Sequence, residues 1–357
     1  MIILRPICTI IATDKKHKQM KAIKITEPSV MKVVDIDKPV AKAGEVLLKV
    51  HYVGFCGSDL NTYRGLNPMV NMPVIPGHEI GAVIETIGEG VPEHLAVGMN
   101  VTVNPYTNCG VCASCRTRRY NACEHNENLG VQRDGAMAEY ICVPWQKVIP
   151  VGNITPEHTA LIEPMSVGFH AVSRAEVVDT DIVMVIGCGM VGVGAVVRAV
   201  LRGATVIACD IDDEKLDIVT KMGAHYAINS IKENVHDRLV EITGGLMPSV
   251  IIEAVGSPIT YNMAVNEIGF CGRVVCIGYA KQDVAFHTKL FVQKELDIRG
   301  SRNALPEDFE GVIKYLNSHD CPYDVLISNV ATIDKAAEAM EEWVANPAKV
   351  FRILVKF

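Results

Sequence analysis

The segment that decides the fold of this 357-residue chain spans residues 182–197 and reads IVMVIGCGMVGVGAVV. Its first five residues are apolar and mostly β-branched, which predicts a buried strand. A G-x-G-x-x-G turn follows at once, made of Gly187, Cys188, Gly189, Met190, Val191 and Gly192. Glycines in this pattern permit a tight turn, let the backbone approach a pyrophosphate and let helix and strand pack closely. The segment therefore predicts a strand–turn–helix unit that binds a dinucleotide at the helix N-terminus.

The same segment has no charged residue, so a membrane span is an alternative interpretation. Its sixteen residues fall short of the roughly 20 that cross a bilayer. The glycines at positions 187, 189, 192 and 194 suit a strand-to-helix turn better, and Arg198 and Arg202 follow directly. We therefore expect a soluble protein.

The next apolar run, residues 204–210, ends in Asp210. This acid stands 23 residues after Gly187, where dinucleotide-binding proteins place the group that contacts the adenosine ribose hydroxyls. A carboxylate there repels a 2′-phosphate; Asp212 and Asp213 follow it, and no arginine stands beside it. The pattern favours NAD over NADP. A glycine-rich turn that binds nothing is the alternative, which the order of strand, loop, helix and acid disfavours.

Outward from this segment, residues 165–302 alternate short apolar strands with helices, which predicts a parallel sheet with helices on both faces. Residues 20–164 read as short strands between glycine and proline breakers, the pattern of a β-rich domain. The remainder, residues 303–357, contains two amphipathic helices and a closing strand and is expected to return to the first domain. Residues 1–19 look unlike the rest, and we interpret them as an N-terminal extension.

Composition excludes several classes of protein. Hydrophobic residues make up 49% and charged residues 21% of the chain, which excludes a disordered or coiled-coil protein. Lysine and arginine number 34 against 41 acidic residues, a net charge of −7, so nucleic acid is not an expected partner. The N-terminus lacks the features of a secretion signal, and a reducing, cytoplasmic location is expected.

Four of the twelve cysteines lie within fifteen residues: Cys109, Cys112, Cys115 and Cys123. Four thiolates with the spacing C-x2-C-x2-C-x7-C can close a tetrahedron around Zn²⁺ and leave no open position, which is typical of a structural site. A redox pair or chance clustering is the alternative. The sequence therefore predicts a structural zinc lobe at 105–125.

A second group of candidate ligands comes from two shorter motifs. Residues 54–59 read GFCGSD and contain Cys56, and residues 76–79 read PGHE and contain His78 and Glu79. Cysteine, histidine and carboxylate side chains are all Zn²⁺ ligands. By themselves these residues are only suggestive, because a lone cysteine and a lone histidine are more often buried packing residues, and a surface charge is the alternative for Glu79.

Taken together, five motifs resemble the zinc-containing medium-chain alcohol dehydrogenase superfamily. They are GFCGSD, PGHE, the four-cysteine lobe, EPMSVGFHA at 163–171, and GCGMVG at 187–192 with Asp210, in matching order from Met20 to the C-terminus. The resemblance implies an α/β protein with a GroES-like β-rich catalytic domain in two pieces. A Rossmann domain, a doubly wound parallel sheet, lies between the pieces, and the active site is expected in the cleft.

The resemblance also implies a catalytic zinc site. Cys56, His78 and Glu79 match its ligands. Glu163 stands where alcohol dehydrogenases of this superfamily have a second cysteine ligand. This variant resembles the polyol and threonine dehydrogenase branch, in which Glu79 and Glu163 share or exchange places on the metal. Ser58 matches the hydroxyl that takes the proton of the substrate alcohol.

One position departs from the family pattern. Asn61 stands where relatives often have a histidine that continues the proton relay. An asparagine amide cannot take up a proton at neutral pH. The outer relay is therefore left open between water and a cofactor ribose hydroxyl.

Further cofactor contacts are implied by the same resemblance. They are Lys215, near the adenosine ribose, and Ile277, Gly278, Ser301 and Arg302, which flank the nicotinamide. Arg302 is also a candidate to meet a substrate carboxylate, which would suit an aldonate; a surface arginine, or one that meets the cofactor phosphate, is the alternative. Residues 130–140 and 294–309 are most similar to dehydrogenases of sugar acids, such as L-galactonate, and of polyols.

The expected function is therefore zinc-dependent oxidation of a secondary alcohol to the ketone with hydride transfer to NAD, with two Zn²⁺ per chain. Threonine or butanediol is an alternative substrate. An NADPH-dependent enone reductase is disfavoured, because such relatives lack the metal ligands, and so is a catalytically silent NAD-binding scaffold, because no ligand is lost. By analogy, pairing of a sheet edge near 271–280 implies a homodimer or homotetramer.

Overall fold

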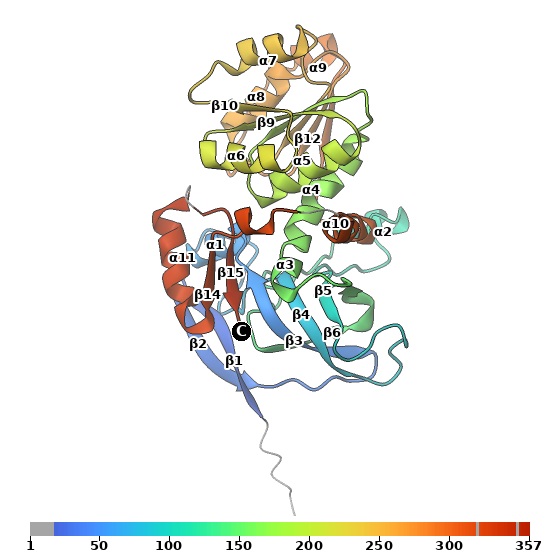
Figure 1. The fold of residues 1–357 in the computed structure, drawn as a ribbon, viewed down its shortest axis with the longest axis vertical. Coiled ribbons are helices and arrows are strands. Elements are labelled where there is room, and N and C mark those ends of the chain that lie inside the picture. Colours follow the sequence, from blue (N-terminus) through green and yellow to red (C-terminus); the bar gives the residue numbers. More distant parts are fainter. Residues whose placement is uncertain (1–17, 319–320, 348–349) are drawn as a thin grey trace, which may run out of the picture.

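The computed structural model describes residues 18–318, 321–347 and 350–357. They form two units, one above the other in Figure 1, with the middle of the sequence in the upper unit and both ends of the sequence in the lower one. Most of the predicted N-terminal extension, residues 1–17, lies outside the described residues. Gln19, the last residue assigned to it, already belongs to β1 (Gln19–Glu27).

The upper unit is built on six parallel strands in the order β10-β9-β8-β11-β12-β13. Counted from β8 as the first strand, this is the order 3-2-1-4-5-6 of a doubly wound dinucleotide-binding sheet. The predicted α/β fold class is confirmed. The strands are β8 (Ile182–Ile186), β9 (Thr205–Asp210), β10 (Tyr226–Asn229), β11 (Val250–Glu253), β12 (Arg273–Cys276) and β13 (Asp297–Gly300).

Both faces of this sheet are buried because alternate side chains of each strand point to opposite sides. Val183 and Val185 join one apolar cluster with residues of α5 (Met190–Leu201) and α6 (Asp213–Lys221). Met184 and Ile186 join another with α7 (Val235–Thr243) and α8 (Pro258–Glu267). This two-sided burial explains why the strands read as continuous apolar runs.

The lower unit contains a hairpin of β1 with β2 (Val30–Asp37) and a larger sheet in the order β14-β15-β3-β4-β5-β7, with β6 paired to β3. The C-terminal strand β15 runs antiparallel to β3, with Leu354 opposite Gly54. The end of the chain therefore lies in the unit that the N-terminal half begins. The sheet strands are β3 (Glu45–Gly54), β4 (Glu79–Ile87), β5 (Asn100–Val103), β6 (Tyr140–Pro144), β7 (Val148–Pro150), β14 (Asn329–Thr332) and β15 (Ile353–Lys356).

Helix α4 (Ile162–Ala175) connects the two units (Figure 1). A Cβ on Gly168 of α4 would lie 2.2 Å from the carbonyl oxygen of Val191, and one on Gly194 would lie 2.3 Å from that of Met165. Glycine at both positions thus lets α4 lie directly on α5. The boundary expected between 164 and 165 falls in the first turn of α4, and the domain limits stay a proposal. The other helices are α1 (Gly57–Tyr63), α2 (Ala113–Arg116), η1 (Tyr120–Ala122), η2 (Trp145–Lys147), α3 (Pro156–Thr159), α9 (Lys289–Gln293), α10 (Pro306–Ser318), η3 (Tyr323–Val325), η4 (Ile333–Lys335) and α11 (Ala336–Ala345).

The expectation that the sheet edge lies near 271–280 is wrong. Strand β12 pairs with β11 on one side and with β13 on the other, so β13 forms that edge. Three of the four residues of β13 are polar or glycine, and Ile298 is 46% exposed. The strand therefore lacks the apolar run that predicts buried strands.

Among the residues that the structure describes, no helix combines the length and hydropathy of a membrane span. The apolar segment at 182–197 is divided between β8 and α5, as its glycines predict.

Candidate functional site

Two neighbouring antiparallel strands bring together Cys56, His78 and Glu79. The end of the first strand lies beside the start of the second. Cys56 follows β3 and precedes α1, whereas Glu79 is the first residue of β4. The antiparallel register pairs Gly54 with Glu79, which brings the two motifs side by side. One ligand atom from each of the three side chains lies within 4.8 Å of the others. The pleated pairing, rather than sequence proximity, thus assembles the candidate metal centre.

The Glu79 carboxylate is held from two sides. A Cβ on Gly54 would lie 2.2 Å from Glu79 Oε2, so only glycine leaves room for the carboxylate. On the other side, Nη1 of the buried Arg352 donates to Glu79 Oε1 at 2.8 Å and also to the carbonyl oxygen of Phe55. Sequence analysis missed Arg352. The one hint in the sequence is that this arginine stands in the otherwise apolar start of the closing segment FRILVKF.

The field at this centre favours positive charge. Burial by itself lowers the pKa of His78, but Cys56 and two nearby carboxylates raise it well above its usual value. Burial raises the pKa of Glu79 to about 7, although the Arg352 guanidinium opposes that shift. The shift of His78 records the negative groups around its imidazole, and the shift of Glu79 records mainly its burial. A buried site lined with several negative groups stabilises a cation.

The donor atoms at the centre fit Zn²⁺. Within the described part of the chain, the buried atoms His78 Nδ1, Glu79 Oε2 and Ser58 Oγ have no hydrogen-bond partner. Buried polar atoms are normally paired, so unpaired ones on the residues of this centre leave donor and acceptor capacity for a ligand. A thiolate, an imidazole and a carboxylate are the ligand types of catalytic zinc, which keeps one position open.

Asp59 is a second residue that sequence analysis missed. It is fully buried on α1, and its Oδ2 accepts a 2.9 Å hydrogen bond from the backbone N–H of Cys56. Burial raises the pKa of Asp59, whereas the positive charge of His78 acts against that shift. The Asp59 carboxylate thus fixes the turn that carries Cys56. Its negative charge also interacts with the His78 imidazole.

Glu163 lies near this centre without joining the close cluster. Its charge acts on both His78 and Glu79, but among the described residues the three-residue cluster of ligand atoms does not include it. Instead, the buried Tyr106 hydroxyl donates to Glu163 Oε1. Burial and the Glu163 charge raise the pKa of Tyr106 well above its usual value, so the phenol keeps its proton and remains a donor. The structure therefore places Glu163 beside the centre, tethered to Tyr106.

The four predicted lobe cysteines also converge, with their sulfurs within 4.8 Å of one another. Backbone N–H groups point at the sulfurs: that of Cys109 at Cys123 Sγ (3.3 Å) and that of Cys112 at Cys109 Sγ (3.4 Å). The Ser114 hydroxyl and backbone N–H groups lower the pKa of Cys112. Donors aimed at sulfur stabilise thiolates, the form that binds metal.

The glycine turn has the geometry that the motif predicts. Gly187 has φ +93°, and a Cβ on Gly192 would lie 1.9 Å from the Gly187 carbonyl oxygen, so both positions require glycine. Asp210 closes the turn, because its carboxylate accepts hydrogen bonds from the N–H groups of Cys188 and Ile211, each at 2.7 Å. The loop and its acid thus form one unit at the carboxyl end of the sheet.

The remaining predicted cofactor residues lie along the same edge, since parallel strands present their carboxyl ends together. Ile277 and Gly278 follow β12, and Ser301 and Arg302 follow β13. Ser301 is buried, and its Oγ has no partner in the described ranges, while the Arg302 side chain is exposed. Lys215 lies on α6, the helix that begins just beyond Asp210.

Two apolar residues on this edge were missed. Ile211 follows β9 and is 61% exposed, and Val255 follows β11 and is 51% exposed. Their strands flank β8, so the two side chains lie on either side of the glycine turn. Exposed aliphatic residues beside a ligand edge suit the faces of an adenine ring.

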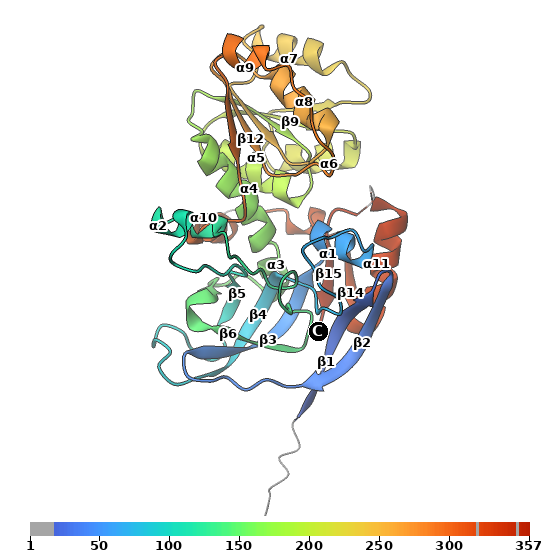
Figure 2. The same cartoon turned by 180° about the vertical axis from the view of Figure 1, so that it is seen from behind.

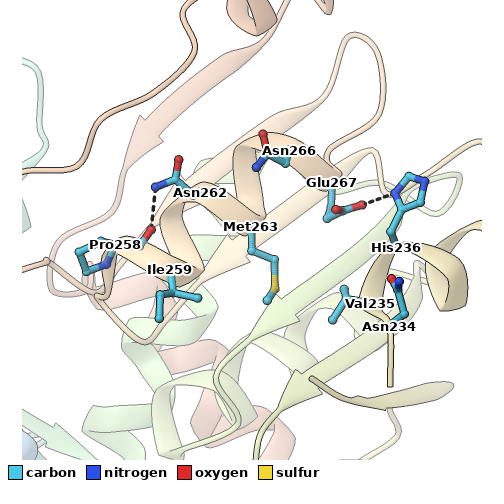
Figure 3. A pocket seen from close by; sticks show the side chains of 9 residues that line it. All are labelled: Asn234, Val235, His236, Pro258, Ile259, Asn262, Met263, Asn266 and Glu267. Atoms are coloured by element: carbon cyan, nitrogen blue, oxygen red, sulfur yellow. Dashed lines mark hydrogen bonds and ion pairs between the residues drawn. The ribbon is translucent and has the colours of Figure 1, made fainter. Parts of the chain in front are cut away.

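A surface groove between α7 and α8 lies apart from these residues (Figure 3). His236 of α7 and Glu267 of α8 form a 2.8 Å pair that joins the two helices along it. Figure 1 shows α7 at the end of the molecule opposite the lower unit. No predicted site residue lines the groove, and we assign it no part in the site. Its lining residues are Asn234, Val235, His236, Pro258, Ile259, Asn262, Met263, Asn266 and Glu267.

Comparison with known proteins places both units in described families. An alcohol dehydrogenase GroES-like domain matches residues 42–153, and a zinc-binding dehydrogenase domain matches residues 191–318. An uncharacterized zinc-type alcohol dehydrogenase-like protein of Haemophilus influenzae is 33% identical over 342 residues, 95% of this chain and 99% of the relative.

Two further relatives are similar over most of the chain. The L-galactonate-5-dehydrogenase of Escherichia coli is 32% identical over 319 residues, 89% of this chain and 94% of the relative. A crystal structure of an alcohol dehydrogenase from Escherichia coli CFT073, complexed with the cofactor NADH, superposes with a TM-score of 0.87 at 30% identity. That comparison covers 95% of this chain and 99% of the other.

Proposed function

This chain belongs to the zinc-type medium-chain alcohol dehydrogenase family, and from that premise we propose that it oxidises a secondary alcohol of a sugar acid or polyol with NAD. The observation that carries the proposal is the convergence of Cys56, His78 and Glu79, with ligand atoms within 4.8 Å of one another. Helix α4 supports it, because it carries Glu163 beside this centre and packs on α5, which begins at the glycine turn.

We assign Cys56, His78 and Glu79 to the catalytic metal, with Glu163 beside them, and the four lobe cysteines to a structural Zn²⁺. Bound Zn²⁺ supplies Lewis-acid polarisation of a hydroxyl, and NAD supplies the hydride acceptor. Arg352 and Tyr106 orient the two carboxylates, because each donates to one carboxylate oxygen and leaves the other for the centre.

Ser58 is the proposed proton acceptor for the substrate hydroxyl. Its buried Oγ has no hydrogen-bond partner among the described residues, so it is available to a substrate. Asn61, three residues on, cannot take up a proton and therefore does not continue the relay beyond Ser58. The glycine turn and Asp210 are the groups that would hold the pyrophosphate and the adenosine ribose of a bound dinucleotide.

Two features favour a hydroxyl-rich acid as substrate. Arg302 is exposed at the carboxyl edge of the sheet, where its guanidinium can pair with a carboxylate in a two-bond geometry. The two carboxylates at the centre, Glu79 and Glu163, add hydrogen-bond acceptors for a hydroxyl-rich substrate. The 32% identity with the Escherichia coli L-galactonate-5-dehydrogenase supports the same class.

A substrate panel tests this proposal. We expect NADH formation with aldonates such as L-galactonate and with alditols. Aldonates should show a kcat/KM at least about tenfold above that for butanediol, which has no carboxylate to pair with Arg302, because a paired carboxylate contributes roughly 1.5–3 kcal/mol. The measurement is initial-rate absorbance of NADH in enzyme loaded with Zn²⁺. Preference for threonine or butanediol would select that alternative, and inactivity toward every alcohol would refute the function.

The cofactor preference gives a separate prediction. In Asp210→Asn the charge that faces a 2′-phosphate is gone while the side-chain shape stays, so kcat/KM for NADP relative to NAD should rise at least about tenfold. Initial rates with the two cofactors measure the ratio. Asp217→Asn, an exposed substitution on the neighbouring α6, is the matched control. An unchanged ratio would contradict the role of Asp210.

We also propose that the chain assembles as a homodimer or homotetramer. Strand β13 leaves one edge of the sheet unpaired among the described strands, and Ile298 on it and Val292 nearby are exposed. An open edge with exposed apolar side chains is a surface that a second copy can pair with.

A further inference from the structure

Asn121 links the four-cysteine lobe to the segment that leaves the Rossmann sheet. It lies in η1, two residues before Cys123, and only 3% of it is exposed. Its Nδ2 donates to the backbone carbonyl oxygen of Arg302 at 2.7 Å. In return, Asn303 Nδ2 donates to the backbone carbonyl oxygen of Asn121 at 2.9 Å. Residues 302 and 303 are thus tied to the lobe from both directions.

The same amide reaches a buried histidine on α4. Asn121 Nδ2 lies 2.9 Å from His170 Nε2, and His170 Nδ1 lies 2.7 Å from Asp308 Oδ2. All three side chains are buried. Asp308 also accepts from the Leu305 N–H at 2.9 Å, so it fixes the start of α10. The chain of contacts therefore runs from the lobe through α4 to α10.

The hydrogen-bonding chemistry sets the orientation of every group in this chain. A backbone carbonyl only accepts, so the Asn121 atom that contacts Arg302 must be the amide nitrogen. That nitrogen then also donates to His170, whose Nε2 must be unprotonated, and the ring proton lies on Nδ1, facing the Asp308 carboxylate. A network with one consistent arrangement is rigid.

The arrangement of the elements agrees with this role. Figures 1 and 2 both show α2 of the lobe beside α10, at the junction of the two units. Bonds from Asn121 to residues outside the lobe are not required to hold a metal between four sulfurs. They hold the backbone from which Ser301 and Arg302 project at the carboxyl edge of the sheet.

We propose that Asn121, oriented by His170 and Asp308, is a positioning residue that fixes segment 301–303 for dinucleotide binding. The inference rests on the proposed NAD-dependent function, and it assigns the four-cysteine lobe a second role beside its structural one. Because η1 is held between Cys115 and Cys123, the metal that closes the lobe also sets where Asn121 points. The four-cysteine lobe is thereby coupled to cofactor affinity.

The test compares NADH binding by the metal-loaded wild type and Asn121→Ala. We expect the NADH dissociation constant, from NADH fluorescence, to rise about tenfold, because the buried amide loses its hydrogen bond to the Arg302 carbonyl and its hydrogen bond to His170. The KM for NAD should rise similarly, with kcat changed less than about threefold, since the proposed catalytic groups are untouched. Thr117→Ala is the matched control, because this lobe hydroxyl bonds only to Ala113 and Ser114 in the described structure.

Asn303→Ala keeps the test decisive if Asn121→Ala loses its lobe zinc or fails to fold. It removes one bond between the segment and the lobe and leaves the lobe side chains intact, so a rise of roughly threefold in the NADH dissociation constant is expected with full zinc content. The proposal is overturned if a folded, zinc-replete Asn121→Ala binds NADH within twofold of wild type, or if Asn303→Ala does so when Asn121→Ala is unusable. Failure of the wild type to bind NADH would instead refute the proposed function.

Discussion

Replacing Cys56 with alanine is expected to lower kcat/KM at least about a thousandfold and to remove one of two Zn²⁺ per chain. Cys56 supplies the one thiolate of the close cluster, and the other anionic ligand, Glu79, is already paired with Arg352. Loss of metal-based polarisation of the substrate removes several kcal/mol of transition-state stabilisation, and each 1.4 kcal/mol is a factor of ten.

The fold should survive this change. Cys56 is half-buried at the N-terminus of α1, and the backbone bond from Cys56 to Asp59 that shapes the turn does not involve its sulfur. Circular dichroism and zinc analysis are therefore measured together with turnover. Cys142→Ala is the matched control, since Cys142 is also half-buried but lies on β6, outside both cysteine-containing clusters. Activity in Cys56→Ala close to wild type would remove Cys56 from the catalytic centre.

Cys112→Ser is expected to affect stability more than chemistry. Three of the four lobe cysteines, Cys112, Cys115 and Cys123, form a small buried cluster of their own, so we expect metal bonds to the four sulfurs to hold the lobe together. Structural zinc contributes folding free energy directly, and the loss of one of four ligands should lower the midpoint of thermal unfolding by about 5–10 °C. One Zn²⁺ per chain should be lost, from the lobe.

Differential scanning calorimetry and zinc analysis measure this prediction, with Cys142→Ser as the control for the change of sulfur to oxygen. Because burial raises the pKa of the Cys142 thiol to about 11, that thiol stays neutral and its replacement removes no anion. A normal melting profile with both Zn²⁺ retained in Cys112→Ser would contradict a structural site.

The Rossmann half of this protein could be predicted from sequence because its signals are local. Apolar strands, the glycine turn and Asp210 follow one another within a short span, and each element obeys its own periodicity. Helix α10 is one of the two amphipathic helices expected in residues 303–357, and it was predictable for the same reason. The four-cysteine lobe was also visible, since its ligands lie within fifteen residues and their type and spacing define the chemistry.

Short or polar elements escaped sequence analysis. Strand β13 has one strongly apolar residue in four, and the sheet edge was therefore placed one strand too early. Glu163 could be named as a candidate ligand from its motif. Nothing in the sequence around Glu163 indicates that the Tyr106 hydroxyl donates to one of the Glu163 carboxylate oxygens.

By itself, then, the sequence determined the dinucleotide turn, the α/β class and the kinds of side chain offered to metal. Only the tertiary structure decided how those side chains are held: Arg352 reaches Glu79 across 273 positions, and Asn121 reaches Arg302 across 181. Such pairs depend on strand register and helix packing between remote segments. No local periodicity records them, because the free energy that selects them arises only when the two segments are buried against each other.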